Sequence, residues 1–140
     1  MDPEQMRERC PSTCFVCVAR LPDHRLAFTR KSTRRNCGVA DAVEAEGNEV
    51  WGVVYEIDDH DLPKLDRLEG VTSGAYVRRD GELLCILDNG DIQASIYFAT
   101  RDKDPPLPNP EYKRLILSGA RFWQLPQLYL DQLERIETEE

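Results

Sequence analysis

Glu49-Val-Trp-Gly-Val-Val-Tyr-Glu56 is the clearest β-strand signal in this sequence. Large apolar side chains recur at every second position as far as Ile57, so Trp51, Val53 and Tyr55 share one face with it. We interpret Trp51 and Tyr55 as core aromatics rather than as platforms for a ligand. The stretch therefore predicts a strand with one face buried in the core.

A short helix is expected directly after this strand, with Pro63 close to its first turn, where proline is tolerated. Leucines recur on one side of it, at Leu62, Leu65 and Leu68. Glu69 is its last residue, and Gly70 stands where helices commonly end with positive φ. A helix C-terminus repels negative charge, so a glutamate there is poorly placed for stability. Its position alone fits an exposed turn residue as well as a functional carboxylate.

Several short motifs follow one another in a fixed order over more than a hundred residues of the chain. They are Val18-Ala19-Arg20-Leu21, Glu49 to Glu56, Asp61-Leu62, Leu65-Asp66, Glu69-Gly70-Val71, Ser73-Gly74-Ala75-Tyr76 and Leu125-Pro126. In this order and spacing they resemble the gamma-glutamylcyclotransferase family. The resemblance implies that Glu69, the glutamate of the Glu-Gly-Val turn, is the catalytic acid/base. It also implies a substrate-binding wall, formed by Gly38, Val39, Ala40, Gly70, Tyr76 and Tyr112.

The implied reaction is an intramolecular cyclisation, in which the α-amine of a γ-glutamyl group attacks its own γ-amide carbonyl. The products would be 5-oxoproline and an amino acid or another amine. Glu69 would carry the proton between the two nitrogens, and no cofactor is required. The leaving group stays open between a free amino acid, a polyamine, an antibiotic amine and a lysine side chain.

The N-terminus departs from the resembled family. There, a strand ending in a Tyr-Gly-Ser-Asn loop precedes the first helix, and the loop backbone holds the glutamyl end of the substrate. Here Asp2 and Pro3 already form a helix start, with a helix expected to about Cys10. We therefore expect a chain truncated at its N-terminus. The rival hypothesis is a non-catalytic binding or interaction module on the same fold.

Length and charge narrow the classes of function. The 140 residues predict one domain, 1–140, with an acidic tail at 136–140. Lys and Arg number 18 against 26 Asp and Glu, a net charge of −8 that argues against nucleic-acid binding. The sequence has no apolar run of about 20 residues, so we expect no membrane span and a cytoplasmic location. The expected partner is a small γ-glutamyl substrate, and a homodimer is left open.

The order of the expected strands and helices predicts the α+β class, as a small mixed β-barrel with short helices. Strands are expected at 13–21, at 26–28 after a Pro22-Asp23 turn, at 76–87 and at 92–99. Turns are expected at 46–48 and at Asp88-Asn89-Gly90-Asp91. Four prolines between 100 and 110 predict a stiff, lid-like loop. Helices should begin at Pro110 and at Pro126, the second carrying Leu128, Leu130 and Leu133.

Three further patterns have ordinary explanations that we favour. Cys10, Cys14 and Cys17 have the spacing of an iron–sulfur site, but five cysteines in a chain of this size fit buried reduced thiols. The acidic cluster around His60 fits helix capping better than metal binding, so no metal site is predicted. The basic residues of 29–35 fit a solvated loop, with attraction of an anionic substrate as the alternative.

Overall fold

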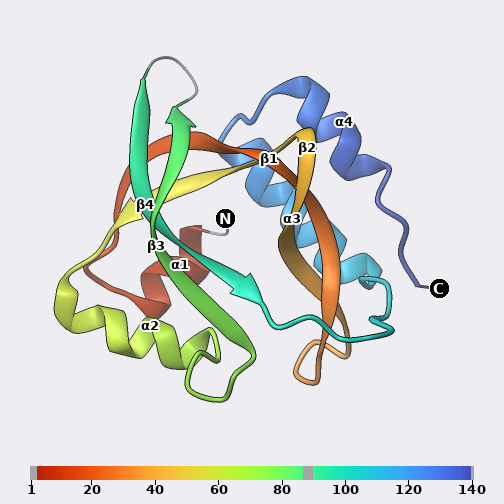
Figure 1. Ribbon diagram of the computed structural model, residues 1–140, viewed down its shortest axis with the longest axis horizontal. Helices are drawn as coiled ribbons and strands as arrows, with labels where there is room; N and C mark the ends of the chain where they lie inside the picture. The colour runs from red at the N-terminus through yellow and green to blue at the C-terminus, as the bar shows by residue number, and fades with distance from the viewer. Residues whose placement is uncertain (1–2, 87–89, 140) are drawn as a thin grey trace.

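The structure, a computed structural model, describes residues 3–86 and 90–139. It confirms the α+β class, with one β-sheet and several short helices (Figure 1). In chain order the elements are α1 (Pro3–Arg9), β1 (Cys14–Ser32), β2 (Cys37–Glu56), the 3₁₀ turn η1 (Asp59–Asp61), α2 (Leu62–Leu68), β3 (Tyr76–Ile86), β4 (Asp91–Ala99), α3 (Pro110–Phe122) and α4 (Gln127–Glu134).

The four strands form one sheet in the order β2-β1-β3-β4, and neighbouring strands pair antiparallel. β1 and β2 pair along most of their length, whereas β1 and β3 pair only around Ala19 and Arg20. Among the residues that the structure describes, no ladder between β2 and β4 closes the sheet. The term barrel therefore describes it only loosely, although the two hairpins bend toward each other (Figure 1).

Asp41 joins the two edge strands through its side chain. Its carboxylate, which is buried, accepts hydrogen bonds from Ala99 N at 3.0 Å, Thr29 Oγ1 at 2.9 Å and Arg101 Nε at 3.2 Å. A buried carboxylate needs such partners because it has lost its hydration. Asp41 thus connects β2 to β4, two strands that are not neighbours in the described sheet.

Two expected turns lie inside strands. Pro22-Asp23 does not separate two strands but forms an irregularity in β1, and 46–48 lies within β2. Pairing with β2 resumes at once, from Pro22 opposite Glu49 to His24 opposite Glu44. Asp23 adopts a φ of 58° and its carboxylate accepts a hydrogen bond from Gly47 N at 3.0 Å. The irregularity is therefore a β-bulge, and β1 and β2 pair on both sides of it.

The core consists of two clusters on opposite faces of β1. Val18 packs with Trp51 of β2 and with the α3–α4 region, in a cluster completed by Ala120, Leu125, Tyr129 and Leu133. Ala19 and Leu21 face the other side and pack with Leu84 and Phe98 of the β3–β4 hairpin. This division follows from the alternation of side chains along a strand. Trp51 is a core residue as predicted, whereas Leu128 is 79% exposed.

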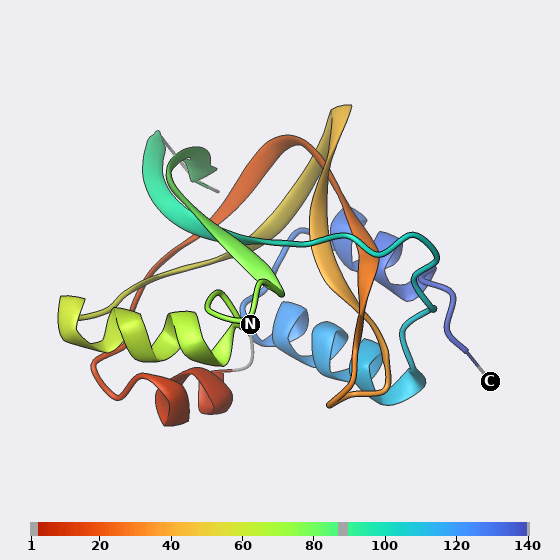
Figure 2. The same cartoon turned by 60° about the horizontal axis from the view of Figure 1, so that its bottom comes forward.

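The helices α1, α2 and α3 lie together beneath the strands in Figure 2. α1 has no buried residue, while α3 buries Gly119 and Ala120, and Ala120 packs with Val18 and Trp51 of the sheet. Asn109 caps α3 by accepting a hydrogen bond from Tyr112 N at 2.8 Å. Among the described residues, no helix is long and apolar enough to cross a membrane.

The cap of the η1–α2 segment differs from expectation. Neither Asp58 nor Asp61 makes a side-chain cap hydrogen bond. Instead Ser12 Oγ accepts from Asp58 N at 3.1 Å and donates to Asp61, which lowers the pKa of that carboxyl. The cap thus comes from a residue 46 positions away, beyond the reach of local pattern. The predicted cap at Asp2 and the first two residues of the predicted 88–91 turn lie outside the described residues.

The segment from Thr100 to Asn109 has no regular structure, as the prolines predict, but it is not a free lid. Pro108 is fully buried, and Leu107 O accepts a hydrogen bond from Gly38 N at 3.0 Å. Asp102 N donates to Thr29 O at 2.8 Å. The segment is therefore fastened along the β1–β2 hairpin.

Candidate active site

Glu69 lies at the point where α2 ends and the chain reverses. It is the C-cap residue, and its backbone N–H donates to Leu65 O at 2.9 Å. Gly70 follows with a φ of +76°. A Cβ on Gly70 would lie 2.8 Å from the Cβ of Ala75, so both the conformation and the packing require glycine here. The sharp turn leaves the Glu69 side chain facing a cavity rather than continuing along the helix surface.

Asp66 fixes the last turn of α2 to the sheet. Its carboxylate accepts a hydrogen bond from Tyr97 Oη of β4 at 2.6 Å and pairs with the guanidinium of Arg78 on β3. Such charge-assisted hydrogen bonds are stronger than neutral ones. Asp66 and Glu69 are three residues apart, so anchoring the first limits the movement of the second.

Arg9, the last residue of α1, pairs with Glu69. Its Nη1 donates to Glu69 Oε1 at 3.0 Å, and both side chains are largely buried, with 21% and 27% exposed. Because only one carboxylate oxygen takes part in this contact, the other remains available to a ligand in the cavity. The pair also ties α1 to α2, two helices that share few other contacts.

Tyr76 and Tyr112 meet the backbone of Ala40 from two sides. Tyr76 Oη donates to Ala40 O at 3.3 Å, and Ala40 N donates to Tyr112 Oη at 3.0 Å. Burial raises the pKa of both phenols, and the nearby Glu69 charge acts in the same direction. Both hydroxyls therefore stay protonated at neutral pH. The resulting wall is held by residues from β2, β3 and α3.

Glu69, Gly70, Tyr76, Tyr112, Val39 and Ala40 line one cavity of about 990 Å³. Six of the seven residues proposed from sequence are therefore brought together. Gly38 is not among the lining residues. A Cβ there would lie 2.0 Å from Pro106 O, so Gly38 admits the proline-rich segment rather than approaching the cavity.

The three cysteines with iron–sulfur spacing do not share one environment. Cys10 is buried, Cys17 is half-buried and Cys14 is exposed, so the three thiols have different environments. Burial raises the pKa of Cys10 and Cys17, which favours the neutral thiol over the metal-binding thiolate. Within the described ranges, no group of three or more His, Cys, Asp or Glu residues could hold a metal ion.

Arg9 and the anchoring role of Asp66 were not found by sequence reasoning. Arg9 is one of two arginines near the end of α1 and is 60 residues from Glu69. Asp66 belongs to a recognised motif, but nothing in its spacing identifies Tyr97 or Arg78 as partners. Both contacts depend on how the helices pack on the sheet.

The AIG2-like family model matches residues 49–133. The mouse protein gamma-glutamylcyclotransferase is 37% identical over 141 residues, covering 98% of this chain and 74% of its own length. The chain belongs to the gamma-glutamylcyclotransferase family. A human gamma-glutamylcyclotransferase is 36% identical over 138 residues, covering 96% of this chain and 72% of the human protein.

A solved structure named gamma-glutamyl cyclotransferase superposes on this chain with a TM-score of 0.91 and 34% identity. The match covers 98% of this chain and 82% of the solved chain. Membership in the gamma-glutamylcyclotransferase family therefore rests on sequence and fold over nearly the same residues. This chain is an enzyme of that family.

Proposed function

We propose that this enzyme cyclises γ-glutamyl amides to 5-oxoproline, with Glu69 as the general acid/base. The α-nitrogen of the glutamyl group forms a bond to the γ-carbonyl carbon, and the bond from that carbon to the leaving nitrogen breaks. The attacking ammonium gives up two protons as it becomes the lactam N–H, and the leaving nitrogen gains two as it departs as an ammonium. Glu69 carries these protons one at a time. No oxidant, reductant or second substrate is consumed.

The observation that carries the proposal is the placement of the Glu69 carboxylate in a cavity wall beside two protonated tyrosines. Because the attack is intramolecular, a site that holds the glutamyl chain curled supplies much of the rate. The wall of Val39, Ala40, Tyr76 and Tyr112 is proposed to do this. Tyr76 and Tyr112 are fixed by Ala40, so little ordering remains when substrate binds.

The decisive variant is Glu69→Gln, which keeps the shape of the side chain and removes its ability to accept a proton. We expect 5-oxoproline formation to fall by about 10²–10⁴-fold with the fold retained. Production of 5-oxoproline from a γ-glutamyl dipeptide measures activity, and circular dichroism measures the fold.

The matched control is Glu56→Gln, an exposed carboxylate at the end of β2 that does not line the cavity. It should keep the full rate. A well-folded Glu69→Gln protein with less than a tenfold loss would show that Glu69 is not the proton carrier.

A further inference from the structure

The cavity has the opposite charge to the chain as a whole. The protein carries −8, yet the described residues that line the cavity include five cations, Arg9, Arg30, Lys31, Arg34 and Arg35. The described part of the chain adds two acids to this lining, Glu69 and Glu111. A wall of this composition raises the local concentration of anions and repels cations.

Two of the five cations already have acidic partners. Arg9 pairs with Glu69, and Arg30 lies 3.9 Å from Asp102 and donates to Thr100 O. The other three, Lys31, Arg34 and Arg35, are here called the basic turn. Lys31 and Arg34 have no ion-pair partner within the described part of the chain, and the Arg35 guanidinium lies 4.8 Å above the Tyr112 ring.

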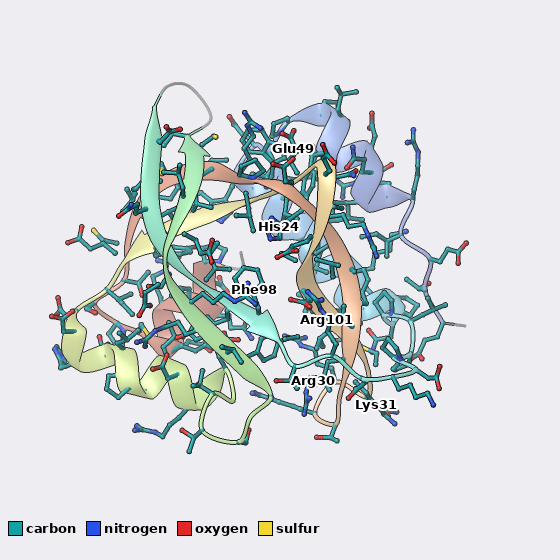
Figure 3. The ribbon with its side chains drawn as sticks, viewed as in Figure 1. His24, Arg30, Lys31, Glu49, Phe98 and Arg101 are labelled. Atoms are coloured by element: carbon teal, nitrogen blue, oxygen red, sulfur yellow. The ribbon has the colours of Figure 1, made fainter. Side chains whose placement is uncertain are left out.

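The backbone of the basic turn is held in place while its charges remain available. Lys31 N donates to the carboxylate of Asp102 at 2.7 Å, and Arg35 N donates to Ser32 Oγ at 3.2 Å. Arg35 O accepts a hydrogen bond from the side chain of Asn109 at 3.2 Å. Figure 3 shows Arg30 and Lys31 together at the end of β1, beside the turn. A fixed backbone lowers the entropy lost when a ligand engages these side chains.

The charges can be compared with those of the substrate. When Asp102 is counted with the two lining acids, the five cations exceed the acids by two among the residues that the structure describes. A γ-glutamyl amino acid with a neutral side chain carries one net negative charge: two carboxylates and one ammonium. The same compound with an acidic leaving residue carries two, which matches the surplus of the cavity.

We propose that the basic turn makes this enzyme prefer γ-glutamyl dipeptides whose leaving amino acid has an acidic side chain. This inference rests on the proposed cyclisation. The glutamyl end occupies the Glu69 and tyrosine wall, and the leaving residue extends toward Lys31 and Arg34. By the same reasoning, a polyamine leaving group is repelled by these charges.

The test compares γ-glutamylglutamate with γ-glutamylglutamine, two dipeptides of nearly equal shape that differ by one charge. We expect kcat/KM to favour the acidic dipeptide by about 10-fold at low salt, the typical effect of one charged hydrogen bond. The double variant Lys31→Gln/Arg34→Gln should reduce this ratio at least fivefold. Arg25→Gln, an exposed cation on β1 outside the cavity, is the matched control and should leave the ratio unchanged.

A direct binding measurement separates this inference from the proposed function. Calorimetry on the Glu69→Gln protein should show the acidic dipeptide binding about 10-fold more tightly, with the preference lost in the added double variant. Cyclisation of both dipeptides at equal rates, with equal binding, overturns the inference and leaves the function standing. Preferential binding without any 5-oxoproline from the unmutated enzyme refutes the function alone. Absence of binding by either dipeptide overturns the inference.

Discussion

Two features hold Glu69 in place, one acting on its side chain and one on its backbone. Arg9 holds Oε1 through a hydrogen bond of 3.0 Å, and the turn at Gly70 fixes the backbone below it. A proton carrier must reach both the attacking and the leaving nitrogen, so its position matters as much as its charge. Arg9 is therefore proposed as a positioning residue, because it acts on Glu69 rather than on the substrate.

For the Arg9–Glu69 pair, we predict the effect of Arg9→Gln. Loss of the guanidinium frees the Glu69 side chain to adopt other rotamers, so kcat for 5-oxoproline formation should fall about tenfold or more. KM should change less, because the tyrosine wall is intact. Steady-state kinetics on one γ-glutamyl dipeptide gives both values.

Arg9→Lys should recover part of kcat, since the ammonium can still pair with the carboxylate. Arg7→Gln changes a neighbouring arginine of α1 that lies outside the cavity, and it should behave as the unmutated enzyme. An Arg9→Gln enzyme with more than half of the normal kcat would exclude the positioning role.

Among the elements, the β1–β2 hairpin and the proline-rich segment form one structural unit. The segment lies against Gly38, and the next residues of β2, Val39 and Ala40, form the cavity wall. Glu139 N also donates to Pro108 O at 3.0 Å, so the C-terminal residues add to this packing. The position of the wall thus depends on the backbone contact between Gly38 and the proline-rich segment.

Gly38→Ala tests this contact. The new Cβ would meet Pro106 O at 2.0 Å, and because that atom belongs to the backbone, the segment must move. We expect the free energy of unfolding to fall by about 1–3 kcal/mol or more. Urea denaturation measures it, and activity should fall as the Ala40 wall shifts.

Gly52→Ala is the matched control for this variant. Gly52 is also a strand glycine of β2, but a Cβ there would meet no atom within 4 Å. Its unfolding free energy should stay within about 0.5 kcal/mol of the unmutated protein. Equal stability of the two variants would mean that the proline-rich segment does not constrain β2.

For the whole molecule, buried tyrosines predict a loss of stability at alkaline pH. Burial raises the pKa of Tyr76, Tyr97 and Tyr112, and it raises the pKa of Tyr129 to about 12. In the unfolded chain tyrosine ionises near pH 10. Above that pH the unfolded chain loses protons that the folded chain retains, so the free energy of unfolding falls as pH rises.

The expected slope is at most about 1.4 kcal/mol per pH unit for each such tyrosine, and it should be absent below about pH 9. Urea denaturation at about pH 8, 10 and 11 measures it. Tyr129→Phe removes one titrating group and should give a shallower decline than the unmutated protein. Stability that stays constant or rises from about pH 9 to 11 would contradict the prediction.

Local sequence determined several elements of this protein. Leucine spacing and Gly70 predicted the end of α2 and placed Glu69 at it, because helix periodicity and positive φ act over a few residues. The strand through Trp51 followed from alternation of side chains, and the start of α3 from Pro110. The order of the motifs predicted the family, which the comparisons confirm.

Only the tertiary structure decided what surrounds Glu69. Arg9 of α1 pairs with Glu69 across 60 residues. The Ala40 backbone of β2 and Tyr112 of α3, which line the same cavity, pair with each other across 72 residues. The same holds for the strands that run through Pro22 and Gly47, where pairing on both sides outweighed local turn preference. The structure also places Gly38 against the proline-rich segment rather than at the cavity. Such contacts depend on the packing of whole elements, which no short stretch of sequence specifies.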